Sequence, residues 1–237
     1  MNATPENPVA TSRYRVLIVD DHPVFRHGIA ALINSEPDLE VCGDASSSPA
    51  ALEAMRTLEP DIALLDVSLP GANGIELVKM MKAEQPHLPL LMLSMHDESI
   101  YALRALRAGA SGYVMKDEAG NHVLTALRRV LDGEIYVSER LGERLIFQAI
   151  HSEGTNAASP VERLSDREME VLNFIGRGFG TKDIAGELHL SGKTIETHRA
   201  HIKEKLGFRD SSEMVRFAVE WVTHEKEAHA GTTHPEA

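Results

Sequence analysis

The sequence predicts a doubly wound α/β domain with a five-stranded parallel sheet, followed by a small domain of four helices. Over residues 14–132, short apolar runs alternate with helix-length segments, and this alternation is typical of βαβ units. After residue 160 the apolar residues recur at helical spacing, and capping motifs mark the starts of successive helices. The 237-residue chain is long enough for two domains of ordinary size.

Polar side chains directly follow four of the apolar runs. Asp20 and Asp21 follow residues 16–19, Asp66 follows residues 62–65, Ser94 follows residues 90–93, and Lys116 follows residues 112–115. In an open parallel sheet the ligand site lies outside the carboxyl ends of the strands, where the strand order reverses. We therefore expect these side chains to meet in one crevice.

The chemistry of these side chains predicts a phosphoryl-transfer site. A carboxylate can attack phosphorus to give an aspartyl phosphate, and Asp66, at the end of the central strand, is the expected nucleophile. With Asp20 and Asp21 it supplies the hard oxygen ligands that Mg²⁺ takes. Lys116 offers a positive charge, and Ser94 a hydrogen-bond donor, to phosphoryl oxygens.

Each of these signals has a simpler alternative when it is taken alone. An Asp-Asp pair before Pro23 is also typical of a turn or a helix cap, and a single Lys or Ser after a strand is commonly only solvated. The combination of fitting residue types at four strand ends favours the phosphoryl-transfer interpretation.

Residues 14–132 resemble the receiver domain of two-component response regulators, which has a flavodoxin-like fold. The resemblance rests on the acidic pair after the first strand, on residues 66–71, on Ser94 and on residues 109–116. The chain departs from the family pattern at Asp117, where many receivers have a proline. It also departs at Met95, where many have a small residue, and we expect Met95 to restrict access to the phosphoryl group.

The resemblance implies a role for each residue of the crevice. Asp66 is the implied phospho-acceptor, and Lys116 is the implied contact to the phosphoryl group. The implied Mg²⁺ ligands are Asp21 directly, Asp20 through water, Asp66, and the backbone carbonyl of Ser68. Ser94 and Tyr113 match the hydroxyl and the aromatic ring that change conformation on phosphorylation, Tyr113 by turning inward.

The composition predicts a cytoplasmic protein outside the membrane. No apolar run approaches the roughly 18 residues of a membrane span, and residues 1–6 lack the features of a signal peptide. The single cysteine, Cys42, excludes an intramolecular disulfide and suits a reducing compartment. The net charge of −12 argues against a protein that coats nucleic acid without sequence preference.

Changes in composition along the chain predict the domain boundaries. We expect a receiver domain over residues 14–133, a linker over 134–160, a helical domain over 161–225 and a frayed polar tail over 226–237. The linker should contain a helix from Glu139 to Ile150, followed by a small and polar stretch up to Pro160.

Capping signals divide the second domain into four helices. The segment from Ser165 to Glu168 is a capping box, and Thr181 and Ser191 are the expected caps of the second and third helices. The segment from Asp210 to Glu213 is a second capping box, which opens the fourth helix. The third helix should end near Leu206. Two short helices joined by a tight turn, the second of them basic, indicate a helix-turn-helix.

The third helix has an apolar face and a polar face. The polar face carries the expected base contacts, and basic residues around it are the expected phosphate contacts. We expect DNA contacts from Lys182, Lys193, Thr194, Glu196, Thr197, Arg199, Ala200 and Lys203. An amphipathic helix with a merely solvated charged face is the alternative, and the preceding capped helix, the short turn and the regulatory domain argue against it.

Residues 163–222 resemble the LuxR-type helix-turn-helix of the NarL/FixJ response regulators. The matching segments are 164–168, 182–185, 190–198 and 202–207. The chain departs from the family at Gly180-Thr181, where Ser/Thr-Asn is common. The last helix commonly forms the dimer interface on DNA, which implicates Met214, Phe217 and Trp221, although packing of the four-helix core is an alternative role for Phe217.

Together, the two resemblances imply a transcription regulator rather than an enzyme. Its expected partners are a sensor histidine kinase, double-stranded promoter DNA, RNA polymerase and a second copy of the chain. We further expect a closed form, in which the receiver masks the recognition helix, and an open form that dimerises. Two alternatives remain: an interaction module that only docks proteins, and an aspartyl-phosphate phosphatase. The phosphatase would need a second Asp two residues after its nucleophile on the first strand, and Asp20 is followed at that spacing by His22.

Other local patterns do not indicate sites. Gly176, Gly178 and Gly180 have the spacing of a phosphate loop but follow a helix instead of a strand. His198 and His201 have a spacing found in metal sites but lack a third ligand nearby in the sequence, so core and phosphate contacts are favoured.

Overall fold

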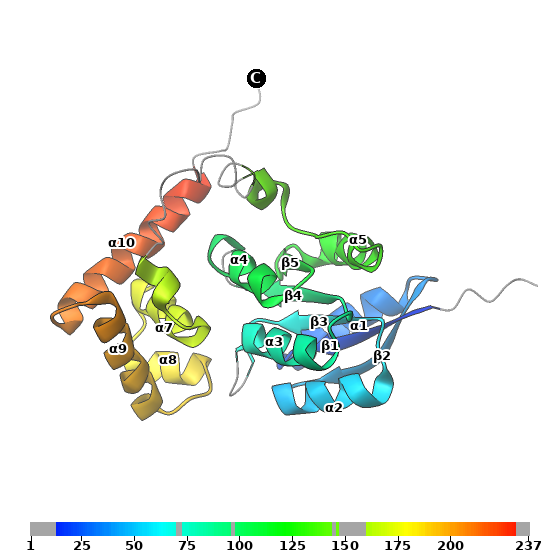
Figure 1. Cartoon of the computed structure of the whole chain (residues 1–237), viewed down its shortest axis with the longest axis horizontal. Helices are drawn as coiled ribbons and strands as arrows, with labels where there is room; N and C mark the ends of the chain where they lie inside the picture. Colours follow the sequence, from blue (N-terminus) through cyan, green and yellow to red (C-terminus); the bar gives the residue numbers. More distant parts are fainter. Residues whose placement is uncertain (1–12, 70–72, 96–97, 144–145, 147–159, 231–237) are drawn as a thin grey trace, which may run out of the picture.

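The computed structural model describes residues 13–69, 73–95, 98–143, 146 and 160–230. Figure 1 shows an α/β domain, blue to green, beside a bundle of helices, yellow to red. The predicted fold class, a five-stranded parallel α/β domain followed by a helical domain, is confirmed.

The first domain alternates strands and helices along the chain. Its elements are β1 (Tyr14–Val19), α1 (Pro23–Asn34), β2 (Leu39–Ala45), α2 (Ser48–Leu58), β3 (Ile62–Asp66), α3 (Gly74–Glu84), β4 (Leu90–Ser94), α4 (Glu98–Ala108), β5 (Gly112–Met115) and α5 (Ala119–Leu131). The strands are parallel in the order β2-β1-β3-β4-β5. Chain order reverses between β1 and β3, so the crevice expected from this topology opens beside Asp20 and Asp66.

Apolar side chains fill both faces of the sheet. On β1, Val16 and Ile18 pack with α1 and α5, whereas Leu17 and Val19 belong to the cluster that includes residues of α2, α3 and α4. Every residue of β3 is buried, which explains its unbroken apolar sequence. None of the described helices has the length and apolar character needed to cross a bilayer.

The chain after α5 remains attached to the receiver sheet. Tyr136 forms a parallel bridge with Gly112 beside β5, and its carbonyl accepts a hydrogen bond from the Tyr113 N–H at 2.8 Å. Residues 139–143 and 146 are helical, which matches the first part of the helix expected over 139–150. The rest of that helix and the polar stretch before Pro160 lie outside the described residues.

The second domain consists of a short 3-10 turn and four helices. These are η1 (Pro160–Arg163), α7 (Asp166–Gly176), α8 (Thr181–Glu187), α9 (Gly192–Leu206) and α10 (Ser211–Ala230). Buried Ile184, Ile195 and Ile202 join the helix-turn-helix to α7 and α10 in one core. Helix α10 continues to Ala230, so it includes the first five residues of the tail expected from 226.

Most, but not all, of the expected helix caps are present. Ser165 and Glu168 form the predicted capping box, and the Ser191 hydroxyl accepts from the Thr194 N–H at 3.1 Å. Thr181 was the wrong choice, because Gly180 is the cap and Thr181 is the first helical residue.

The second predicted capping box is only half formed. The Asp210 carboxylate accepts from the Glu213 N–H at 2.9 Å, as expected for an N-cap. Glu213, however, accepts from the N–H of Arg209 instead of Asp210. The return bond is therefore displaced by one residue.

Candidate functional site

The carboxyl ends of β1, β3 and β5 bring three charged side chains together. The Lys116 ammonium lies 2.6 Å from Asp66 Oδ2 and 2.8 Å from Asp20 Oδ2. All three side chains are at least 90% buried, and the Lys116 ammonium also lies 4.7 Å from the centre of the Phe25 ring. The sequence prediction that these side chains converge is confirmed by this geometry.

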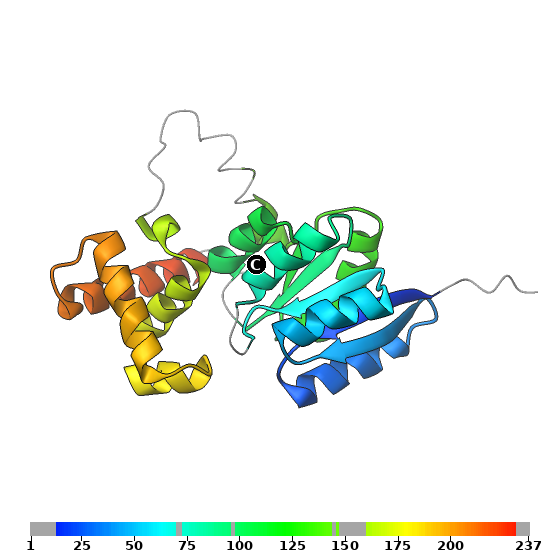
Figure 2. The same cartoon turned by 60° about the horizontal axis from the view of Figure 1, so that its bottom comes forward.

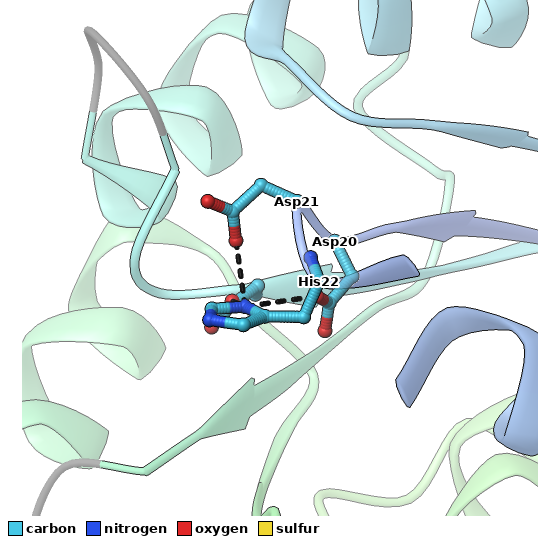
Figure 3. A group of neighbouring side chains, drawn as sticks. Asp20, Asp21 and His22 are labelled. Atoms are coloured by element: carbon cyan, nitrogen blue, oxygen red, sulfur yellow. Dashed lines mark hydrogen bonds and ion pairs between the residues drawn. The ribbon is translucent and has the colours of Figure 1, made fainter. Parts of the chain in front are cut away.

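Asp21 and His22 form the outer side of the same cluster. The His22 Nδ1 atom lies 2.8 Å from Asp21 Oδ1 and 3.4 Å from Asp20 Oδ1, as Figure 3 shows. Ligand atoms of Asp20, Asp21, His22 and Asp66 all lie within 4.8 Å of one another. Three carboxylates and one imidazole therefore surround a space of the size that a metal ion occupies.

Burial sets the acidity of the central carboxyl group. Removal from water raises the pKa of Asp66 from 3.8 to about 6, and the Asp20 charge adds to this rise. The Lys116 charge and the Ser68 N–H, which donates to Asp66 Oδ1 at 3.1 Å, act in the opposite direction. Burial lowers the pKa of Lys116, but the two carboxylates outweigh it and raise that pKa above its usual value. Lys116 is therefore a cation, and Asp66 is largely ionised at neutral pH.

The turn after β3 holds Asp66 in place. Ser68 forms an antiparallel bridge with Asn73, whose side chain caps α3 by accepting from the Ile75 N–H at 2.8 Å. The Gly74 N–H donates to the Val67 carbonyl at 2.7 Å. Gly74 has to be a glycine, because a Cβ atom there would lie 2.1 Å from the Asp66 carbonyl oxygen. The start of α3 thus presses directly against the backbone of the expected phospho-acceptor.

Ser94 is the last residue of β4, and Tyr113 is the second residue of β5. Ser94 is fully buried, and its carbonyl accepts from the Lys116 N–H at 2.8 Å, which ties the two strand ends together. Tyr113 is only 1% exposed, and the turning of its ring on phosphorylation stays a prediction.

The donor set of this cluster fits Mg²⁺. Carboxylate oxygens are the ligands that Mg²⁺ prefers, and the ion usually keeps several waters beside one or two carboxylates. Asp20, Asp21 and Asp66 supply such oxygens, and Asp21 and Asp66 line a cavity of about 520 Å³, which has room for those waters. His22 is the member of the cluster that does not suit Mg²⁺, since imidazole favours softer ions.

The expected DNA-contacting residues lie on the accessible surface of α8 and α9. Side chains of Lys182, Lys193, Glu196, Thr197 and Ala200 are exposed, and those of Thr194, Arg199 and Lys203 are half-buried. Figures 1 and 2 show α9 on the side of its domain that faces away from the receiver. The expectation that the receiver masks the recognition helix is therefore wrong for this arrangement.

Hydrogen bonds across the helix-turn-helix position two of these residues. The Thr181 hydroxyl donates to Glu196 Oε1 at 2.6 Å, so the first residue of α8 holds a predicted base-contacting residue of α9. The Arg199 guanidinium lies 3.9 Å from the same carboxylate. The Thr197 hydroxyl donates to the Lys193 carbonyl at 3.1 Å, and the residue is exposed.

Helix α10 does not present all three residues expected in a dimer interface. Met214 is fully buried, so it packs the core of its own domain and offers no surface to a partner. Phe217 packs against Phe208 with ring centres 5.1 Å apart, which favours the alternative role in the core. Trp221 is half-buried, whereas Val215 and Val219 are exposed among the α10 residues up to 223.

Several residues of the site escaped the sequence argument. His22 is adjacent to the acidic pair, and that adjacency was a usable signal. Gly74 carries only the weak signal of a glycine at a helix start. Arg104 on α4 and Asp166 on α7 form an ion pair of 3.0 Å between the domains, and nothing in their sequence spacing of 62 residues predicts it.

Models of two protein families match this chain. Residues 16–128 match the response regulator receiver domain, and residues 162–218 match the bacterial regulatory proteins of the luxR family. The oxygen regulatory protein NreC of Staphylococcus haemolyticus is 34% identical over 209 residues, which cover 86% of this chain and 96% of NreC.

Solved structures give the same assignment. A two-component response regulator of the LuxR family from Aurantimonas sp. SI85-9A1 matches with a TM-score of 0.55 and 32% identity, over 59% of this chain and all of that one. RcsB from Salmonella enterica serovar Typhimurium, bound to promoter P1flhDC in the presence of phosphomimetic BeF₃⁻, matches with a TM-score of 0.58 and 28% identity, over 87% of this chain and 98% of RcsB. The chain therefore belongs to the two-component response regulators that join a receiver domain to a LuxR-type DNA-binding domain.

Proposed function

We propose that phosphorylation of Asp66 controls sequence-specific binding of promoter DNA by this response regulator. The observation that carries the proposal is the Asp66 carboxylate at the end of β3, 2.6 Å from the Lys116 ammonium and within reach of two further carboxylates. A buried nucleophile with a fixed cation and a cation-binding cluster is the equipment that phosphoryl transfer needs.

The residues of the site divide the reaction between them. An Asp66 carboxylate oxygen attacks the phosphorus of an acyl phosphate or phosphohistidine, and the bond from phosphorus to the donor oxygen or nitrogen breaks. The donor leaves with that electron pair, and Asp66 becomes an acyl phosphate. Lys116 and the Ser94 hydroxyl, in the roles we propose, face the phosphoryl oxygens. Bound at Asp20, Asp21 and the Ser68 carbonyl, Mg²⁺ would neutralise charge on the phosphoryl group.

The expected partners follow from this activity and from the relatives. A sensor histidine kinase is the expected phosphodonor, and small phosphodonors can replace it. Promoter DNA is the expected target, because the solved RcsB structures contain promoters and a phosphomimetic. The repeated half-sites that such domains read would bring two copies of the chain together. RNA polymerase is then the expected downstream partner, and the cytoplasm the expected location.

Incubation with acetyl phosphate and Mg²⁺ should add one phosphoryl group to the protein, at Asp66. Intact-mass measurement should show this addition in the wild-type chain and none in Asp66→Ala, because the variant lacks the nucleophile. Asp117→Ala is the matched control, since Asp117 follows Lys116 but is exposed. Undiminished labelling of Asp66→Ala would refute the assignment of the acceptor.

Substitutions on α9 should separate base reading from phosphate contact. Glu196→Leu or Thr197→Leu should change base preference, at about 1–3 kcal/mol per lost base contact. Lys203→Ala should weaken binding to all sequences alike and reduce the slope of log affinity against log salt by about one. Selection of bound fragments from random DNA, followed by salt titrations, measures both effects. If the α9 variants select the same DNA sequence as the wild type and bind it with the same affinity, the recognition face lies elsewhere. That result would favour a module that only docks proteins.

A further inference from the structure

The cavity over Asp66 is closed on one side by the DNA-binding domain. It is lined by Asp66 and Lys116 of the receiver and by Arg177, Phe179 and His189 of the DNA-binding domain. His189 ends the turn after α8 in a left-handed conformation (φ 51°), and its Nε2 atom lies 3.5 Å from Asp21 Oδ2. The helix-turn-helix therefore contacts the cation-binding cluster of the other domain.

An arginine on α4 holds the DNA-binding domain in this position. Arg104 donates to the carbonyls of Val161 and Leu164, both at 2.9 Å, and to Asp166 Oδ1 at 3.0 Å. The other Asp166 oxygen accepts from the Lys79 ammonium at 3.1 Å. The side chains of Arg104 and Asp166 are only 16% and 7% exposed, so water screens their pairing weakly. We call the Arg104–Asp166 pair the clasp.

Helix α4 also holds the first part of the linker. The Glu98 carboxylate accepts from the Ser138 N–H at 3.0 Å and from the Ser138 hydroxyl at 2.5 Å. One helix therefore contacts the chain on both sides of residues 147–159. Because α4 begins four residues after Ser94, a change at the phosphorylation site can reach both contacts through this helix.

A buried carboxyl group in the same interface opposes closure. Glu170 on α7 is fully buried, and burial raises its pKa to about 7 despite the nearby Arg167 guanidinium and Asn73 amide. The nearby Asp166 charge adds to the rise. Burial raises the pKa of Tyr101 on α4, and the Glu170 charge adds to that rise. An ionised Glu170 is thus unfavourable in the closed interface. Closure consequently depends on the clasp and on the apolar cluster shared by both domains.

We propose that the DNA-binding domain is a lid over the phosphorylation site, held shut by the Arg104–Asp166 clasp, and that the lid selects phosphodonors by size. The inference rests on the proposed function, because it concerns access to Asp66. A small phosphodonor fits the cavity of about 520 Å³. A protein that carries phosphohistidine must bring its own surface to Asp66 and meets the end of α8. Phosphotransfer from a kinase therefore requires the lid to open. In the closed arrangement the domain contact covers Asp66 and not the recognition helix.

A thiol placed inside the cavity reports on the lid directly. Ser68 lines the cavity next to Asp66, so Ser68→Cys in the full chain, with Cys42→Ser to remove the native thiol, provides one reactive group. Its alkylation is measured with iodoacetamide, which is small, and with a maleimide that carries a polyethylene glycol chain. Clasp variants are Arg104→Ala and Asp166→Asn, and the control is Arg107→Ala, which removes an exposed arginine from the same helix.

The large reagent should distinguish the clasp variants from the control. Its rate should rise about tenfold in Arg104→Ala and in Asp166→Asn, equivalent to about 1.4 kcal/mol of lost closure. The rate with iodoacetamide should change less than about twofold, and Arg107→Ala should leave both rates unchanged. Circular dichroism identifies a variant that fails to fold, and Asp166→Asn, which preserves side-chain volume, replaces Arg104→Ala in that case.

Two results would refute the lid proposal. In the first, the large reagent labels the protein with an intact clasp as fast as it labels the clasp variants. In the second, the Arg107→Ala variant is labelled by the large reagent as fast as the clasp variants are. Alkylation needs no phosphoryl transfer, so either result leaves the assignment of Asp66 intact. Conversely, a protein that acetyl phosphate fails to label at Asp66 would refute the proposed function without changing the alkylation rates.

Discussion

Replacement of Gly74 by alanine should both destabilise the receiver and nearly abolish phosphorylation of Asp66. The new Cβ atom would lie 2.1 Å from the Asp66 carbonyl oxygen and 2.8 Å from the Val67 Cα atom. Both neighbours are backbone atoms of a fully buried strand end, so the clash cannot be relieved by a side-chain rotation. We expect the free energy of unfolding to fall by about 3 kcal/mol, and labelling by acetyl phosphate to slow by about a hundredfold because the nucleophile is displaced.

Gly28→Ala is the matched control for this prediction. Gly28 lies on an exposed face of α1, and its added Cβ would meet no atom within 4 Å outside its chain neighbours and the backbone of its own helix. Alanine favours a helix interior over glycine by about 0.5–1 kcal/mol, so this variant should be slightly more stable and label normally. Urea unfolding and intact-mass measurement on both variants test the pair. Equal stability of Gly74→Ala and wild type would show that α3 can move away from β3 without consequence.

The sequence predicts the convergence of Asp20, Asp66 and Lys116 well because parallel-sheet topology dictates it. Once a run such as residues 62–65 is identified as a buried strand, the residue that follows it must lie at the edge where all carboxyl ends meet. The same reasoning predicts Ser94 at this edge. No knowledge of side-chain packing is required, because the apolar pattern identifies the strands and the parallel topology places their carboxyl ends at one edge.

Contacts between distant parts of the chain follow no such rule. The clasp joins Arg104 to Asp166, and the position of the DNA-binding domain depends on it. Amphipathic patterns describe how each domain covers its own core and leave open which surfaces of two domains meet. For this reason the expectation of a masked recognition helix failed, although the helix itself was predicted correctly.

Local side-chain competition explains the smaller errors. Thr181 has the chemistry of an N-cap, but its hydroxyl instead bonds to Glu196 in the neighbouring helix. Glu213 bonds to the Arg209 N–H, one residue before the position that a capping box requires. Met214 has the position that the family assigns to a dimer contact, yet its periodicity fits the core equally well, and the structure buries it.

Asp66→Asn should stabilise the metal-free protein at pH 7.5 and leave its stability at pH 4 almost unchanged. The pKa of Asp66 is about 6 in the folded chain and 3.8 where the carboxyl group is not buried. Because folding raises the pKa of this acid, its ionisation opposes folding. Well below pH 3.8 the carboxyl group is neutral in both states, so no penalty exists, and at pH 4 only a small part of the penalty has developed. The penalty grows as the pH rises through 6 and then stays constant, at about 3 kcal/mol for a difference of about two pKa units.

An asparagine side chain is neutral at every pH and has nearly the same shape, so the variant removes this penalty. It also weakens the contact to Lys116, but that ammonium keeps Asp20 at 2.8 Å and is not left unpaired. Urea unfolding in EDTA at both pH values, followed by circular dichroism, should show the gain only at pH 7.5. Asp117→Asn, at an exposed position beside the site, should change neither midpoint.

Addition of Mg²⁺ should then reverse the order of stability at pH 7.5. A divalent cation favours the ionised form of the surrounding carboxylates, so it stabilises the wild-type chain, which offers three of them, more than the variant, which offers two. If Asp66→Asn is instead less stable than wild type at pH 7.5 in EDTA, the Lys116–Asp66 attraction outweighs the burial of the charge. The cluster would then be a stabilising ion pair in the absence of metal. Relief of the buried Asp66 charge would then not be what favours cation binding.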